Sequence, residues 1–160
     1  MWLDRFSVRN LELLSPNQSD GIPLIDVLNH VVTPMGSRML RKWVVLPLKE
    51  KTAIAGRLNR VAALVKDSSR LESIIISLKK IGDLERLVSK VATGRINPRE
   101  LHQLKNSLEP IGPIKTLLAE SSEKSLRQLA KSLNDHEEFM HHVTQSLTDA
   151  PPMLLHQGNV

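Results

Sequence analysis

The chain is poor in the residues that build many kinds of functional site. It has no cysteine and no tyrosine, which excludes disulfide bonds, thiolate metal ligands and thiol nucleophiles. Only four aromatic residues are present: Trp2, Phe6, Trp43 and Phe139. So few rings argue against a surface that stacks single-stranded nucleic acid or sugars. No run of about 18 apolar residues occurs, and Asp4, Arg5 and Arg9 interrupt the first apolar positions. The sequence therefore predicts no signal peptide and no membrane span, and the lack of cysteine favours the cytoplasm.

Motifs that carry catalysis are missing as well. No glycine is followed by lysine, so the phosphate-binding loop G-x-x-x-x-G-K-[ST] is absent, as are G-x-G-x-x-G and G-x-S-x-G. The run from His136 to His142 resembles a zinc-protease helix, but His136 and His141 are five residues apart, and a shared helix face needs four. We interpret this run as a solvated helix face, and adventitious metal binding is the alternative. The sequence thus predicts no catalytic, cofactor-binding or metal-binding residue in this chain.

Positive charge is what the chain has in excess. The formal net charge is +5, and residues 1–60 carry nine basic against five acidic residues. Residues 38–60 contain seven basic residues, and Glu50 is the only acidic residue among them. We interpret this stretch as a solvated helix surface whose arginines pair with acids, and contact with nucleic-acid phosphates is the alternative. Arg38, Arg41 and Lys42 are the candidate DNA-contacting residues.

Apolar residues recur at three- and four-residue intervals along most of the chain, which predicts an all-α fold over residues 21–150. Residues 1–20 lack this spacing and are expected to be irregular or to form a short strand, as are residues 153–160. The predicted helix starts are Thr33 before Pro34, a capping box of Ser69 with Glu72, Asp83, and Asn97 before Pro98. Pro47 and Gly94 are expected to end helices, and residues 110–113 to bend or break one.

Three segments together resemble the MutS family of DNA mismatch repair proteins, in its core or lever region. They are LDRFSVRNLEL at residues 3–13, TPMGSRMLRKW at 33–43 followed by Pro47-Leu48, and IGDLERL at 81–87 followed by RINPREL at 95–101. Residues 151–155 and 158–160 look like the approach to the family's DNA clamp. The residues that carry the resemblance are Asn10, Glu12, Thr33, Pro34, Gly36, Arg38, Trp43, Pro47, Asp83, Glu85, Arg86 and Pro98.

The resemblance implies a single lever domain over residues 1–160, built as a bundle of long antiparallel helices. Such a lever links mismatched-DNA binding to an ATPase that holds ATP and Mg²⁺ in other domains, and it acts within a homodimer. Under this reading the chain is a piece without enzymatic activity, its partners are the connector, clamp and ATPase domains, and Gly36 permits close helix packing while Trp43 anchors the core. The alternative is a free-standing basic helical module that binds nucleic acid nonspecifically.

The resemblance also carries an expectation about packing. If the returning half of the lever is missing, the apolar stripes at Leu101, Leu104 and Leu108, or at Leu126, Leu129 and Leu133, lack part of their cover. We then expect the chain to self-associate, or else the later helices to refold onto the helix pair of residues 54–78, because a large exposed apolar face is unfavourable in water.

Overall fold

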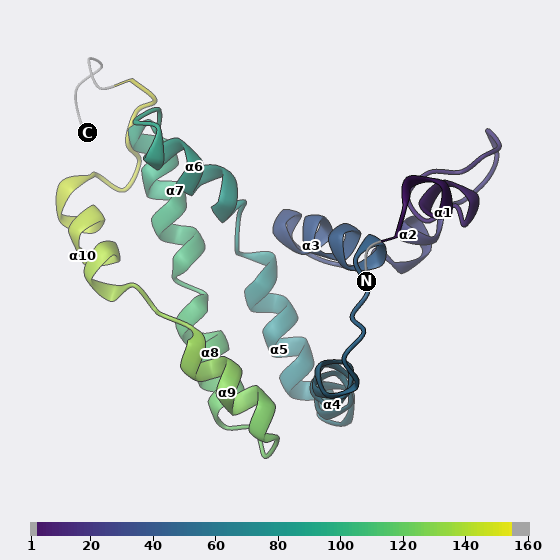
Figure 1. Cartoon of the computed structure of the whole chain (residues 1–160). Helices are drawn as coiled ribbons and strands as arrows, with labels where there is room; N and C mark the ends of the chain where they lie inside the picture. The colour runs from purple at the N-terminus through teal and green to yellow at the C-terminus, as the bar shows by residue number, and fades with distance from the viewer. Residues whose placement is uncertain (1–2, 155–160) are drawn as a thin grey trace. The chain divides into compact units, whose positions relative to one another are not determined.

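The computed structural model describes residues 3–154, and those residues form helices and no strand, which confirms the predicted all-α class (Figure 1). The helices are α1 (Arg5–Asn10), α2 (Leu24–Leu28), α3 (Pro34–Val45), α4 (Lys51–Lys66), α5 (Ser68–Lys79), α6 (Leu84–Ala92), α7 (Pro98–Leu108), α8 (Ile111–Ala119), α9 (Lys124–Ser132) and α10 (Glu137–Ser146). Two compact units make up the chain, Met1–Leu58 and Asn59–Val160, and the division falls inside α4.

The first unit contains α1, α2 and α3. The expectation of an irregular segment or short strand over residues 1–20 is wrong at Arg5–Asn10, which form a helix because the Asp4 carboxylate accepts a hydrogen bond from the Ser7 amide at 2.9 Å. The chain then turns, and the amides of Leu24 and Ile25 donate to the carbonyls of Glu12 and Leu13. Leu13 and the fully enclosed Ile25 form the core of this unit.

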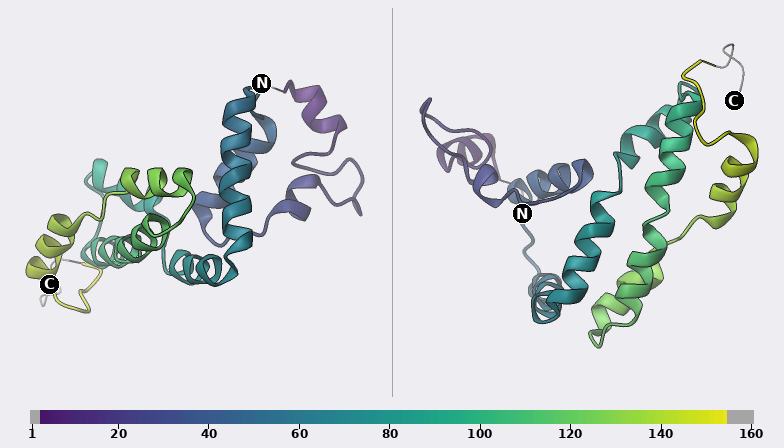
Figure 2. Two further views of the ribbon diagram at one scale, coloured as in Figure 1. Left: turned by 90° about the horizontal axis from the view of Figure 1, so that it is seen from below. Right: turned by 180° about the vertical axis from the view of Figure 1, so that it is seen from behind.

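The second unit is a helical bundle in which both consecutive helices and helices farther apart in the sequence pack side by side. Helix α9 lies beside α8, α10 beside α7, α5 beside α8, and α6 beside α7 (Figures 1 and 2). Its core consists of buried aliphatic side chains, chiefly Ile74, Leu87, Leu104, Ile114, Leu118, Leu126, Ala130 and Val143. The helix period predicted from the sequence therefore places Leu104 and Leu126 correctly on the inner faces.

Most helix ends lie where the sequence predicts them. Thr33, Asp83 and Asn97 are the N-caps of α3, α6 and α7. Gly94 follows α6 with φ +65°, a left-handed conformation that glycine adopts without strain. Near Pro110 the helix is interrupted, because α7 ends at Leu108 and α8 begins at Ile111, with Glu109 and Pro110 between them still in the right-handed helical region.

One expectation about the helical region is wrong, and a second holds only in part. Helix α5 is capped by Asp67, whose carboxylate accepts from the Arg70 amide at 3.0 Å, and not by the predicted box of Ser69 with Glu72. The expectation that the stripes of α7 and α9 lack part of their cover holds only in part, because Leu104 and Leu126 are buried whereas Leu129 is 37% exposed. A further exposed apolar stripe lies on α4, where Ile54, Leu58, Val61 and Val65 are 38–66% exposed.

At the end of the described chain, Met153 and Leu154 form no strand. The remaining positions of the expected approach to the clamp, residues 155–160, lie outside the described residues. No helix in residues 3–154 has the length and apolar content that crossing a membrane requires.

Candidate functional site

The best-defined polar structure in the second unit is the corner between α6 and α7. Asp83 accepts from the Arg86 amide at 3.3 Å and thereby begins α6. Glu85 lies in the first turn, where its negative charge is favoured by the helix dipole, and Arg86 is exposed. The Asp83–Arg86 segment therefore caps the helix, as the sequence indicates.

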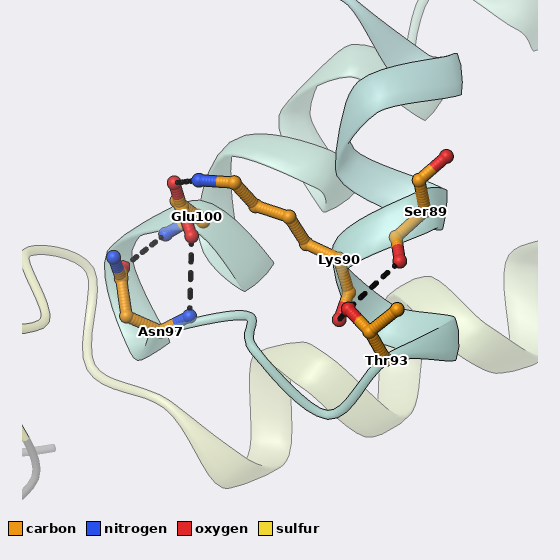
Figure 3. A network of polar contacts seen from close by, with 5 residues as sticks. All are labelled: Ser89, Lys90, Thr93, Asn97 and Glu100. Carbon is orange, nitrogen blue, oxygen red and sulfur yellow. Dashed lines mark hydrogen bonds and ion pairs between the residues drawn. The ribbon is translucent and has the colours of Figure 1, made fainter.

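Helix α7 begins with a complete capping box (Figure 3). The Asn97 side chain accepts from the Glu100 amide at 2.9 Å, and a Glu100 carboxylate oxygen accepts from the Asn97 amide at 3.3 Å. Pro98 occupies the first helical position and is buried. These two reciprocal bonds satisfy backbone donors that a helix start otherwise leaves to water.

The second carboxylate oxygen of Glu100 ties α7 to α6. It accepts a hydrogen bond from the Lys90 ammonium group on the last turn of α6, as Figure 3 shows. This bond holds the pKa of Glu100 below its ordinary value, and partial desolvation opposes the shift. One carboxylate thus joins a helix end to the next helix start.

A second polar contact joins the α5–α6 turn to the last turn of α7, at the other end of the α6–α7 pair. The Gly82 amide donates to the Ser107 hydroxyl at 3.2 Å, and that hydroxyl donates to the Gln103 carbonyl at 2.8 Å. Ser107 is buried, and an added Cβ on Gly82 would approach its Oγ to 2.9 Å. Close approach of the turn to α7 therefore requires glycine at this position.

In the first unit, α3 has the start that the sequence predicts. Thr33 Oγ1 accepts from the Gly36 amide at 3.1 Å, and Pro34 is the first helical residue. The expected role of Gly36 in helix–helix packing needs correction. An added Cβ would lie 2.9 Å from Thr33 Oγ1, so glycine here makes room for the cap itself.

The basic face of α3 consists of Arg38, Arg41 and Lys42, and all three residues are exposed. Trp43, expected to anchor the core, is 43% exposed. The Arg57 guanidinium lies over its ring, with the guanidinium carbon 3.6 Å from the ring centroid. This cation–π contact fixes an aromatic surface outside the core. Helix α3 ends at Val45, two residues before Pro47.

The two family-motif residues of the N-terminal segment lie at the end of α1. Asn10 is its last residue and is exposed. Glu12 has φ +48°, which is unusual for a residue with a side chain, and its carboxylate accepts from the Asn17 amide at 2.9 Å. Its carbonyl accepts from the Leu24 amide, so this strained residue connects α1 to α2.

No catalytic constellation comes together from these residues. Among residues 3–154, no three His, Asp or Glu side chains are placed to hold a metal ion. His136 caps α10 in a left-handed conformation, and His141 and His142 are exposed. The chain also lacks a phosphate-binding loop. The residues present therefore do not fit ATP with Mg²⁺.

Sequence reasoning missed three residues that the structure makes important: Arg57, Lys90 and Ser107. The sequence did hold a signal for Lys90. This basic residue lies in the last turn of one predicted helix, and the acidic Glu100 lies ten residues later in the first turn of the next. Ser107 lies 25 residues from Gly82, and nothing local in the sequence marks that contact.

Comparison with known proteins gives a consistent result. The family model of MutS domain III matches residues 7–160. DNA mismatch repair protein MutS of Cytophaga hutchinsonii is 48% identical over 160 residues, which is 100% of this chain and 19% of that protein. The proteins of the same name from Christiangramia forsetii and Flavobacterium johnsoniae are 39% and 38% identical, over 100% and 99% of this chain and 18% of each relative. The chain thus spans about a fifth of the length of these curated relatives.

Proposed function

Because the chain belongs to the MutS domain III family, we propose that it is the helical lever of a DNA mismatch repair protein. In this role it transmits a change between a part that binds mismatched DNA and a part that binds and hydrolyses ATP. The lever itself carries no catalytic step. ATP, Mg²⁺, the mismatch and a second subunit are engaged by the rest of a longer, cytoplasmic protein, and this chain's direct partners are its connector, clamp and ATPase domains.

The observation that carries the proposal is the polar bracing of the α6–α7 corner. Helices transmit a rotation only if the turns between them do not absorb it, because coupling needs rigid elements with few alternative arrangements. The capping box of Asn97 with Glu100, the Lys90 link and the Gly82–Ser107 bond restrain the turns at both ends of α6. These contacts make the α6–α7 pair a stiff element.

Loosening this corner in the longer protein tests the lever. In a full-length protein containing the chain, Asn97→Ala together with Ser107→Ala removes the cap and the buried bond. We expect the stimulation of ATP turnover by mismatched DNA to fall at least about threefold, a coupling loss typical of perturbed allosteric elements. DNA affinity and basal ATP turnover are measured in parallel and are expected to stay unchanged.

Arg99→Ala is the matched control, since Arg99 is an exposed residue of the same first turn. It should leave the stimulation intact. Thermal melting should first show that both proteins are folded. Equal stimulation in the loosened variant and the control would then show that the corner transmits nothing.

A second candidate function rests on the exposed basic face of α3. Arg41 and Lys42 are exposed. We propose that they contact phosphates, which gives weak, sequence-independent binding that falls steeply with salt. Fluorescence anisotropy with matched and mismatched duplexes over a salt series tests this function. If the chain is a free-standing module, it should bind both duplexes with equal affinity, and the double variant Arg41→Glu with Lys42→Glu should lose binding. Binding that does not depend on salt, or no binding at all, would reject this function.

A further inference from the structure

A groove beside α1 combines exposed apolar surface with two positive charges. It encloses about 490 Å³ and is lined by Arg5, Phe6, Val8, Arg9, Leu14 and Ser15. Phe6 is 80% exposed, which is unusual for a phenylalanine, and Val8 and Leu14 are half-buried. All six residues belong to one compact unit, so the groove is formed by a single local structure.

The wall of the groove is held in place by backbone bonds. Residues 11–15 turn back along α1 at the strained Glu12, and the Leu13 amide donates to the Val8 carbonyl at 3.1 Å. Buried Leu13 and Ile25 fasten this turn to the core of the unit. Backbone strain of this kind persists only where the surroundings enforce it, and it is concentrated at functional positions.

The charges at the groove are of one sign. Its two charged lining residues are Arg5 and Arg9, one helical turn apart, and neither forms an ion pair within residues 3–154. The carboxylates of the neighbouring acidic residues accept hydrogen bonds from other residues. Asp4 accepts from the amide and hydroxyl of Ser7, which hold the pKa of that carboxyl below its ordinary value, and Glu12 accepts from the Asn17 amide.

We propose that this groove docks an acidic peptide segment of a partner protein, with an apolar side chain against Phe6 and carboxylates on Arg5 and Arg9. The charge pattern selects an anionic partner, because two unpaired guanidinium groups favour carboxylates and repel basic segments. The apolar floor selects a peptide over a phosphate backbone, since a nucleic acid on the two arginines would leave Phe6, Val8 and Leu14 uncovered. This site is separate from the α6–α7 corner and does not depend on the proposed lever.

The test uses the 160-residue chain and a fluorescein-labelled peptide in which glutamates alternate with leucine and phenylalanine. Anisotropy should show saturable binding that weakens with salt. A peptide with lysine in place of every glutamate should not bind. Arg5→Glu with Arg9→Glu should weaken binding about tenfold or more, because like charges then face each other. Phe6→Ala should weaken it at least about fivefold, as loss of an apolar anchor does.

Matched controls separate the groove from general charge and stickiness. Arg95→Glu with Arg99→Glu changes the net charge equally at exposed positions in the other unit, and Ile22→Ala shortens another highly exposed apolar side chain. Both should bind like the parent chain. Equal loss in these controls, binding of the lysine peptide, or no effect of Phe6→Ala would overturn the proposal. Tighter binding to duplex DNA or to anionic vesicles than to the acidic peptide would also overturn it.

Discussion

Replacing Ser107 by alanine tests the contact that joins the α5–α6 turn to α7. Ser107 is 3% exposed and is the acceptor for the Gly82 amide. Alanine leaves that N–H without its partner, and a stranded donor together with a lost hydrogen bond costs about 1–3 kcal/mol. Because Gly82 is only partly buried, water reaches its amide in the variant, and we expect a cost in the lower part of this range, about 1–2 kcal/mol.

Gly82→Ala probes the same contact from the other side. The new Cβ would lie 2.9 Å from Ser107 Oγ, so this variant should also be destabilised. With alanine at both positions the clashing oxygen is gone, and the nearest remaining atom, Gln103 Nε2, lies 3.6 Å away. The double variant should therefore be more stable than the sum of the two losses predicts, by about 0.5–3 kcal/mol.

Urea unfolding followed by far-UV circular dichroism measures these free energies, provided that the slope with urea stays constant. Ser125→Ala is the control, because its buried hydroxyl has no hydrogen-bond partner in the described part of the chain, and its removal should be neutral or stabilising. The reasoning fails if Ser107→Ala costs no more than Ser125→Ala, or if the two changes at Gly82 and Ser107 add without coupling.

Three further predictions use the same unfolding and association measurements. Lys90 lowers the pKa of Glu100 below its ordinary value of 4.5, so the ion pair stabilises the fold above pH 4.5. This stabilisation is lost as the pH falls through the lower pKa of the folded state. Glu100→Gln should therefore flatten the dependence of the unfolding free energy on pH in that range. Leu126→Ala should cost about 2–5 kcal/mol, because that side chain is 1% exposed, and Leu129→Ala, at 37% exposed, should cost less than half as much. The α4 stripe should make the chain self-associate with rising concentration in sedimentation equilibrium, and Leu58→Lys should keep it monomeric.

Local signals predicted the helices and their starts because those are decided within four residues. Thr33, Asp83 and Asn97 each cap the amide three positions later, and no other part of the chain is needed for that bond. The α5 start was misplaced by the same logic. Both Asp67 and Ser69 are good caps, and the sequence alone does not say which backbone conformation the chain adopts there.

What covers an apolar stripe was not predictable. The stripes of α4 and α9 look alike in the sequence, yet Leu126 is enclosed by the second unit and Leu58 is exposed. The resemblance implies that Trp43 anchors the core, but its ring pairs with Arg57, fourteen positions later. Periodicity identifies the face of a helix that prefers an apolar partner and carries no information about the partner.

The polar contacts that span the turns bear on how such a chain transmits movement. Gly82–Ser107, Lys90–Glu100 and Lys115–Asp135 each join segments separated by 10 to 25 residues, and each reaches across a turn of the second unit. Aliphatic contacts are non-directional, so helices held by them alone can slide or rotate at small cost. A hydrogen bond weakens steeply with distance and angle, so it resists the bending that a turn otherwise permits. Stiffness of the proposed lever then depends on a few directional contacts at its turns more than on the area buried between its helices.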